Sequence, residues 1–430
     1  MQKNNFNLIV EIIKKLPAKA QALIVGGAVR DMLLKLNIND IDIEVYGLEL
    51  NELKKFLASF GVVREVGKSF GILKIDGIDA DWSIPRTDSI GRKPLVKLEP
   101  NMSHKEAFSR RDLTINAIGF DPIANKIIDC FNGQEDLINK KLQAVSNLKF
   151  AEDPLRVLRV MQMISRFEMQ PTAELSKICS NIDLKDLSTM RFKSEFDKLF
   201  SSGKPSLGLR WLYEIGQMAK ILPEINSLAN IFIEYKNQRI NLFELAMQTI
   251  DITSILTFNL NFEQRRKVLW ASLFQYFKLE TSLDFKKCLS RITEYKKLAK
   301  EVELLIKYSQ KPFELITNNL KIDYLKLAAK INPESLNDLG LIAKAKSLAL
   351  NNLVYTEPKS EIDIFLKKAL EFGVLHKPIE PILKGKDFYE LGYRNQDIKK
   401  LLTKAYDIQI TKDLSEKDKI LNKILKINLV

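Results

Sequence analysis

The sequence predicts an α+β fold, with a small mixed sheet in the first third of the chain and helices in the rest. The apolar run 23–25 and the segment 39–45, which alternates polar and apolar residues, are both typical of strands. Segments 70–75 and 78–84 indicate two further strands that turn at an Asp-Gly pair. From residue 216 onward, apolar residues recur at helical spacing with few glycines, which predicts an all-helical remainder.

The composition bounds the class of protein. A chain of 430 residues is long enough for two to four domains. Lysine and arginine total 67 against 54 aspartate and glutamate, and a net charge of +13 favours a polyanionic partner, nucleic acid first. The chain has no apolar run of about 18 residues, so we expect no membrane span. Two histidines exclude histidine-rich metal chemistry, and three widely spaced cysteines fit a reducing cytoplasm.

The segment 23–47 carries the first candidate site. After the apolar run, Gly26 and Gly27 let the backbone turn and approach a ligand without a Cβ in the way. Asp40 and Asp42 are two residues apart in the alternating strand, so their carboxylates point to the same side. Two adjacent carboxylates repel each other unless a cation joins them, and oxygen ligands completed by phosphate suit Mg²⁺. The alternative is an exposed strand face with an incidental acidic pair.

These residues also carry a resemblance. The pattern GG-x-VRD-x-LL, followed after a spacer by D-x-D-x-x-x-x-G, resembles the first motif of the bacterial tRNA nucleotidyltransferase and poly(A) polymerase family. The resemblance implies a polymerase-β-type nucleotidyltransferase head over residues 1–140. It also implies a helical neck over 141–215, a helical body over 216–375 and a helical tail over 376–430.

Two further segments of the head match family motifs. DWSIPR resembles D-x-S-x-PR, which makes Asp81 the third carboxylate; Asp79 is the alternative residue, and an exposed strand face the alternative reading. The segment 86–109, which contains Arg86, Asp88, Gly91 and Arg92, reads as a mobile loop. In relatives that add CCA, a flexible loop here helps the change from C to A addition.

RRDLTINA, residues 110–117, resembles the second family motif. Its resemblance implies that Arg111 holds the triphosphate, because a guanidinium offers planar charged donors. Asp112 is expected to hold that arginine or the fold, and Asn116 to contact the nucleotide. The alternative is a capped helix start with surface arginines.

EDPLRVLR resembles the family's base-selecting motif. A polymerase without a template must offer the base hydrogen bonds from its own side chains, and Asp153 and Arg156 lie three apart on one helix face. Arg159 would reach the triphosphate one turn later. Gln162 stands where the family often has an arginine, and the alternative is an ordinary helix that begins at proline.

The remaining matches are weaker. Residues 190–196 resemble the family's ERI-x-x-E motif, which braces the nucleotide-binding helix. Met190 stands where the family has glutamate, and the spacing of Arg191 and Glu195 predicts an ion pair within one helix. Phe274 and Gln275 occupy positions where some relatives bind metal for a phosphohydrolase, which predicts a helical scaffold without that activity. Segment 381–392 resembles the tail signature of relatives that contact the tRNA elbow, and nearby lysines suit phosphate. These are Lys399, Lys400 and Lys404.

Taken together, the motifs imply nucleotidyl transfer to RNA. Asp40 and Asp42 would hold two Mg²⁺ ions with help from Asp81. The triphosphate of CTP or ATP would contact residues near the glycine turn and the arginines, namely Gly26, Gly27, Arg30, Arg111 and Arg159. The expected reaction adds C, C and A to the 3′ end of tRNA and releases pyrophosphate.

Other functions stay open at this point. A partial enzyme would add only A or only CC, and a poly(A) polymerase would make long A tracts. From another class, the chain would be an inactive RNA-binding relative. We expect tRNA, CTP and ATP as partners, and we infer no protein partner and no membrane.

Overall fold

The computed structural model describes residues 2–38, 40–66, 71–88, 96–279, 284–318, 320–351 and 360–427. Contacts divide the chain into two compact units, Met1–Leu199 with Leu207–Ile221, and Phe200–Ser206 with Leu222–Val430. The finer boundaries expected near residues 140, 215 and 375 stay a prediction.

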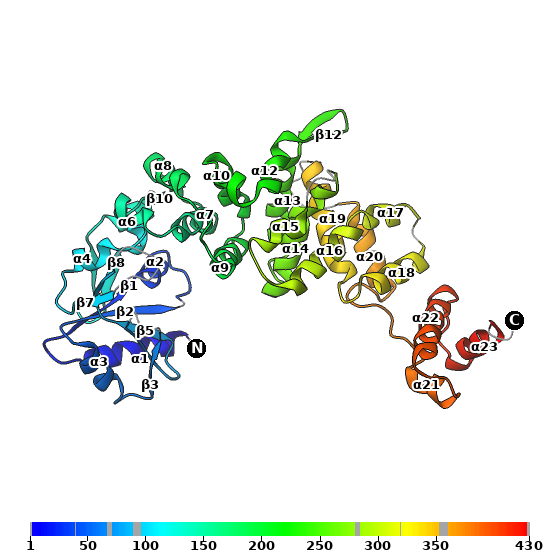
Figure 1. Ribbon diagram of the computed structural model, residues 1–430, viewed down its shortest axis with the longest axis horizontal. Helices are drawn as coiled ribbons and strands as arrows, with labels where there is room; N and C mark the ends of the chain where they lie inside the picture. Colours follow the sequence, from blue (N-terminus) through cyan, green and yellow to red (C-terminus); the bar gives the residue numbers. More distant parts are fainter. Residues whose placement is uncertain are drawn as a thin grey trace. The chain divides into compact units, whose positions relative to one another are not determined.

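A seven-stranded mixed sheet forms the head, as predicted (Figure 1). Its strand order is β3-β4-β5-β2-β1-β8-β9, and β2 pairs with β5 in parallel while the other neighbours are antiparallel. The strands are β1 (Gln21–Val25), β2 (Ile41–Tyr46), β3 (Val63–Val66), β4 (Ile72–Ile75), β5 (Ala80–Ser83), β8 (Ile118–Asp121) and β9 (Lys126–Asp129).

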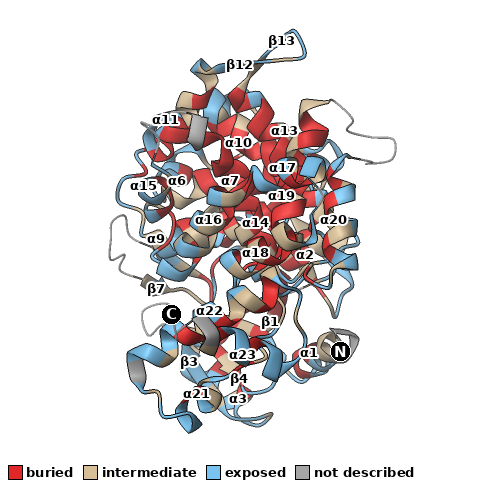
Figure 2. Ribbon diagram, turned by 90° about the vertical axis from the view of Figure 1, so that its right-hand side faces the viewer, coloured by how far each residue is buried: buried red, intermediate tan, exposed pale blue. Residues whose placement is uncertain are grey.

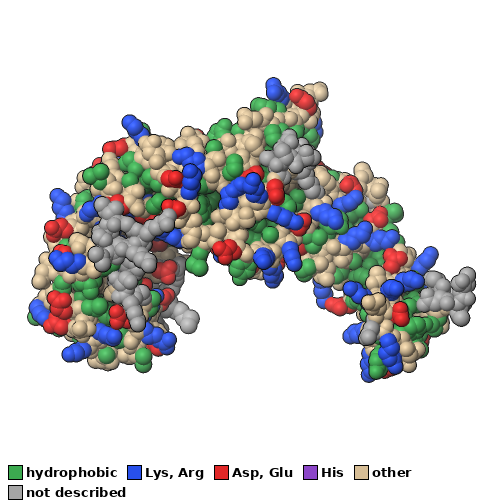
Figure 3. Space-filling view, viewed as in Figure 1, with side chains coloured by type: hydrophobic (Ala, Val, Ile, Leu, Met, Phe, Trp, Pro, Cys, Tyr) green, Lys and Arg blue, Asp and Glu red, His purple; other side chains and the backbone are tan. Residues whose placement is uncertain are grey.

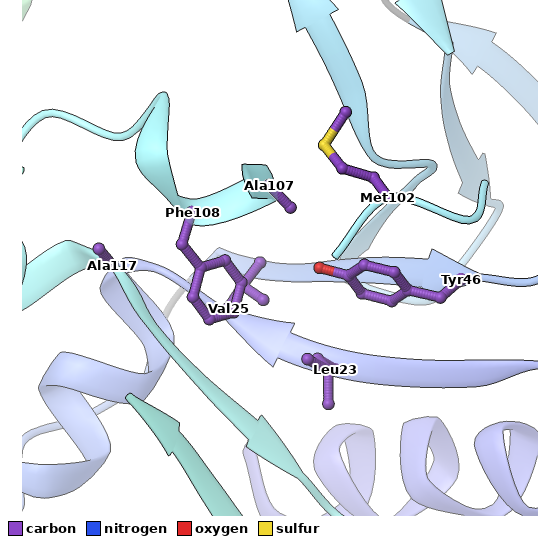
Figure 4. Close-up of a cluster of buried hydrophobic side chains, with 7 residues drawn as sticks. All are labelled: Leu23, Val25, Tyr46, Met102, Ala107, Phe108 and Ala117. Carbon is purple, nitrogen blue, oxygen red and sulfur yellow. The ribbon is translucent and has the colours of Figure 1, made fainter. Parts of the chain in front are cut away.

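Alternation along β1 and β2 builds a core on the face that also carries the acidic residues. Leu23, Val25 and Tyr46 point into one cluster with Ala107 and Phe108 of α4, which spans His104–Ser109 (Figure 4). Met102 and Ala117 complete it. Because successive strand residues alternate between faces, Glu44 and Asp42 lie on the same face as Tyr46, beyond this cluster.

Helices make up most of the rest of the chain up to residue 221. They are α1 (Gln2–Lys14), α2 (Gly27–Leu33), α3 (Leu50–Leu57), α4 (His104–Ser109), α5 (Gly133–Ile138), α6 (Asn147–Ala151), α7 (Leu155–Phe167), α8 (Ala173–Asn181), α9 (Thr189–Phe200), α10 (Pro205–Glu214) and α11 (Gln217–Ile221), with a 3₁₀ turn, η1, at Thr114–Asn116.

The segment 86–109 is more ordered than a loop, so that prediction was wrong in part. Arg86–Asp88 (β6) pairs with Val96–Leu98 (β7), and α4 follows. Ser103 caps α4 and Glu106 completes the capping box, a signal that the sequence did contain. Gly91 and Arg92, predicted for this loop, lie outside the described residues. A short parallel pair, β10 (Lys141–Leu142) with β11 (Gln170–Pro171), follows in the neck.

Glycine lets two helices of the neck approach closely. A Cβ on Gly208 in α10 would lie 2.3 Å from the carbonyl oxygen of Met161 in α7. The Gly208 backbone N–H also donates to the Ser165 hydroxyl at 2.9 Å. The contact fixes α7, which carries Arg156 and Arg159.

The second unit is mostly helical. Figure 2 shows buried residues along α13, α14 and α19, the helices of its core. Its helices are α12 (Pro223–Ser227), α13 (Leu242–Leu256), α14 (Phe262–Phe274), α15 (Phe285–Ser290), α16 (Lys296–Tyr308), α17 (Lys311–Asn318), α18 (Lys321–Ile331), α19 (Leu336–Leu350), α20 (Ile362–Glu371), α21 (Gly385–Glu390), α22 (Asn395–Thr411) and α23 (Lys417–Ile427), with 3₁₀ turns at Leu228–Asn230 and Gln275–Leu279.

One hairpin interrupts this helical unit, contrary to the all-helical prediction. β12 (Phe232–Tyr235) pairs with β13 (Gln238–Asn241), and the turn residues Lys236 and Asn237 both have positive φ. In the core, the buried Phe274 ring stacks on Trp270 with centroids 5.1 Å apart, so this side chain fills space.

The tail helices α21, α22 and α23 have an apolar core of their own, which includes Phe388, Leu401 and Ile420. On the face drawn in Figure 3, Lys and Arg side chains are spread over the described surface with Asp and Glu among them. Within the described part of the chain, no helix combines the length and apolar character that crossing a membrane requires.

We predict that Gly208→Ala destabilises the protein, because the new methyl group would overlap a backbone carbonyl that cannot move without shifting α7. The expected loss is about 1–3 kcal/mol of unfolding free energy. Gly203→Ala is the matched control, since nothing lies within 4 Å of a Cβ there. Urea unfolding followed by circular dichroism measures both, and equal midpoints would contradict the packing argument.

Candidate active site

Two carboxylates lie side by side on the sheet. In the parallel register of β2 and β5, Asp42 is the direct partner of Asp81. Asp40 precedes β2 and has a φ of +52°, so it lies outside the strand in which the sequence placed it. Asp79 also lies outside β5, where its backbone hydrogen-bonds to the Asn5 side chain. The structure thus brings Asp42 and Asp81 together in one row.

Crowding by protein atoms raises the pKa of Asp42 above its ordinary value. Arg111 opposes this shift, whereas the negative charges of Asp81, Asp40 and Glu44 add to it. A cation between the carboxylates would relieve their repulsion. Within the described ranges, no three His, Cys, Asp or Glu side chains gather into a metal-binding group. Mg²⁺ usually takes one or two carboxylates and completes its shell with water and substrate phosphate.

Glu44 anchors the two arginines of the RRD segment. Its fully buried carboxylate accepts hydrogen bonds from Arg110 at 2.8 Å and from the Tyr46 hydroxyl at 3.0 Å, and Arg111 lies 3.8 Å away. Burial works to raise the pKa of Glu44, but Arg111 and Arg110 hold it below its ordinary value. Glu44 therefore stays ionised and fixes positive charge beside Asp42.

The glycine turn makes room for one of these arginines. Gly26 has a φ of +75°, and a Cβ there would lie 2.7 Å from Nη1 of Arg111 and 3.7 Å from Oδ2 of Asp42. The Arg111 Nε is buried and makes no hydrogen bond to any described residue. A backbone without a side chain, a guanidinium and a carboxylate therefore meet at one point, which suits a phosphate with its cation.

A buried polar chain crosses from α2 to α7 through η1. Arg30 donates to the Asn116 side-chain oxygen at 2.7 Å, and the Asn116 amide donates to Asp112 at 3.0 Å. Asp112 in turn lies 2.8 Å from Nε of Arg159. Arg30 also pairs with the neighbouring Asp31 at 2.7 Å.

Most of the residues in this buried network already contact other side chains of the protein. Arg30 and Asn116 are buried and brace the fold, so their predicted nucleotide contacts stay predictions. Asp112 holds an arginine, as expected, but that arginine is Arg159 rather than Arg111. Gln162, in place of a further arginine, is buried and accepts a hydrogen bond from Arg166.

The predicted base-selecting residues lie at the start of α7. Asp153 lies before α7, so the prediction that it shares one helix face with Arg156 was wrong; its carboxylate accepts from the Leu155 backbone N–H at 3.1 Å. Arg156 donates to the carbonyl oxygens of Arg110 and Lys149 at 2.7 and 2.6 Å. The neck helix is thereby tied to the backbone of the RRD segment.

Sequence reasoning missed three contributors. Arg191 reaches both oxygens of Asp153, at 2.9 and 2.8 Å, instead of pairing with Glu195. The two residues are 38 positions apart, and no short sequence pattern predicts their contact. Lys74 on β4 lies 2.5 Å from Asp81, which raises the pKa of Lys74. Glu44 could have been found, because it continues the every-second-residue acidic pattern of β2.

Two family models match about the first half of the chain. Residues 22–143 match the poly A polymerase head domain, and residues 169–228 match a probable RNA and SrmB-binding site of polymerase A. The chain resembles the family of bacterial tRNA nucleotidyltransferases and poly(A) polymerases. The motif order read from the sequence and the mixed sheet are both those expected of this family.

Curated relatives and solved structures agree with this family. The chain is 36% identical over 222 residues to the multifunctional CCA protein of Aliivibrio salmonicida, which covers 49% of the chain and 53% of the relative. It is 33% identical over 251 residues to the CCA-adding enzyme of Buchnera aphidicola, covering 55% and 59%. The chain spans about half the length of the curated relatives it matches.

The likeness in fold runs through almost the whole chain. The CCA-adding enzyme of Bacillus stearothermophilus in complex with CTP has a TM-score of 0.69 at 19% identity, covering 99% of this chain and 98% of that one. The Thermotoga maritima CCA-adding enzyme complexed with tRNA has a TM-score of 0.60 at 19% identity, covering 98% and 94%. The fold is therefore that of CCA-adding enzymes.

We predict that Asp112→Asn lowers stability at neutral pH by about 1–3 kcal/mol, because Arg159 loses its charged partner. Burial works to raise the pKa of Asp112, but Arg159 and Asn116 hold it below the ordinary value. The carboxylate therefore contributes full stability well above pH 4, the usual Asp value, and loses it as pH falls through the lower folded pKa.

Urea unfolding at pH 7, 5 and 3 tests this prediction. The wild-type protein should lose more stability between pH 5 and 3 than Asp112→Asn does. Parallel losses in the two proteins would show that the buried carboxylate is not stabilised as its contacts indicate.

Proposed function

We propose that the protein is a template-independent tRNA nucleotidyltransferase that adds C, C and A to tRNA 3′ ends from CTP and ATP. The observation that best supports nucleotidyl transfer is the pairing of Asp42 with Asp81, next to the place where the Arg111 guanidinium lies against Gly26. The similarity to CCA proteins and to a family model for an RNA-binding site supports tRNA as the substrate. The free thiols of the three cysteines fit a cytoplasmic location.

In the proposed reaction, the RNA 3′-hydroxyl attacks the α-phosphate of the nucleotide and pyrophosphate leaves. Asp42 and Asp81, with Asp40, would hold Mg²⁺ against the triphosphate. When bound, Mg²⁺ supplies positive charge that lowers the pKa of the attacking hydroxyl and stabilises the leaving group. Arg111 would bind triphosphate oxygens where Gly26 leaves space, and Arg159, which Asp112 holds, would contact the triphosphate as well.

Base selection is proposed for Asp153 and Arg156. One guanidinium nitrogen of Arg191 serves both Asp153 oxygens, so lone pairs remain to accept from the amino group of C or A. Arg156 would offer donors to the base by exchanging a backbone partner. The tail is proposed to contact the tRNA elbow through lysines of α22, which bind phosphate without sequence preference.

Extension of a tRNA that lacks CCA, with CTP and ATP present, tests this function. We predict growth by C, C and A and then a stop. Asp42→Asn should lower the rate about a thousandfold, as expected when several kcal/mol of charge stabilisation are lost. Asp79→Asn is the matched control and should act like the wild-type protein, since Asp79 is exposed and lies outside β5.

Each other product identifies another function. Addition of A alone to a CC-ended tRNA means an A-adding enzyme, and addition of two C means a CC-adding enzyme. Long A tracts on an unrelated RNA mean a poly(A) polymerase. A folded protein that binds tRNA but extends nothing would be an inactive RNA-binding relative.

We also predict that Gly26→Ala weakens CTP binding about tenfold, because its methyl group would displace the Arg111 guanidinium. Gly77→Ala is a matched control. Gly77 has a similar φ of +83°, so backbone strain is alike, but nothing lies within 4 Å of its Cβ. Isothermal titration with CTP and Mg²⁺ compares the two variants. Equal affinities for CTP would show that the space at Gly26 does not position Arg111 for triphosphate binding.

A further inference from the structure

A lysine continues the row of the two carboxylates across the sheet. β4 and β5 are antiparallel with Leu73 opposite Trp82, so Lys74 stands opposite Asp81. Leu73 and Trp82 are fully buried, so Lys74 and Asp81 point from the other face. Their Nζ and Oδ1 atoms are 2.5 Å apart. Asp42, Asp81 and Lys74 therefore form one line over three adjacent strands.

The charge of Lys74 is directed at the carboxylates rather than at the cationic residue on its other side. Arg64 on β3 is the next residue in the row, and it lies 2.7 Å from Asp76. The Lys74 ammonium thus lies beside Asp81. A metal cation bound by both Asp42 and Asp81 would come close to this ammonium.

We propose that Lys74 is an internal counter-ion that competes with the divalent cation for Asp81. The inference rests on the proposed nucleotidyl transfer. An ammonium and a divalent cation are drawn to the same oxygens and repel each other, so Lys74 weakens cation binding to the protein alone. A bound triphosphate would bring further negative charge to the cation, which would offset this repulsion. The cation therefore binds tightly together with the nucleotide, and Lys74 acts as a positioning residue.

Binding of Mn²⁺ to the full chain, without nucleotide or RNA, tests the proposal through electron paramagnetic resonance of the free ion. Lys74→Met should bind Mn²⁺ about tenfold more tightly than the wild-type protein. Lys74→Arg keeps the charge and should bind like the wild-type protein. Lys54→Met is the matched control and should change nothing, because Lys54 is exposed on α3 and pairs with Glu65.

A second pair of variants separates competition from a general effect of charge. In an Asp81→Asn background, Lys74→Met should no longer tighten Mn²⁺ binding, since the shared carboxylate is absent. Added CTP should reduce the difference between Lys74→Met and the wild-type protein. Tightening of equal size in both backgrounds would overturn the counter-ion role.

The outcomes also distinguish this proposal from the function on which it rests. If Mn²⁺ binds in an Asp42-dependent way but Lys74→Met leaves its affinity unchanged or weakens it, only the counter-ion role fails. If the wild-type protein binds no Mn²⁺ with or without CTP, the proposed metal-dependent transfer and the counter-ion role both fail.

Discussion

Two buried hydrogen bonds and one ion pair join the helix after the glycine turn, the 3₁₀ turn η1 and the neck helix α7. Arg30, Asn116, Asp112 and Arg159 contact one another in that order. Removing one member would leave its neighbours buried without partners, which is more costly than the loss of one exposed contact. The groups proposed to bind the nucleotide on these three elements are therefore fixed together.

The carboxylates of the sheet have positive neighbours of their own. Asp42, Asp81 and Glu44 place negative charge on one face, and Arg110, Arg111 and Lys74 stand next to them. Local neutralisation lets like charges stay close in a partly dry site. The proposed triphosphate and its cation would therefore meet positive as well as negative groups at this face.

Local patterns predicted more than distant contacts did. Alternation and the Asp-Gly turn predicted β2, β4 and β5, and the ordered motifs supplied the candidate site residues, whose roles stay predictions. The β12–β13 hairpin was missed because its turn is Lys236-Asn237 rather than a typical Asn-Gly pair. Arg30 shows the other limit. Its direction depends on Asn116, 86 positions away, and no short motif encodes that contact.

The two hydrogen bonds of the Asn116 side chain fix the orientation of its amide. Its oxygen faces a guanidinium and its nitrogen faces a carboxylate, so each end meets the opposite kind of partner. Conversion of this amide to an acid, as in spontaneous deamidation, would replace the donating end with a second acceptor beside Asp112. Because Asn116 is buried, such a change would place a second negative charge beside Asp112 with little water to screen it.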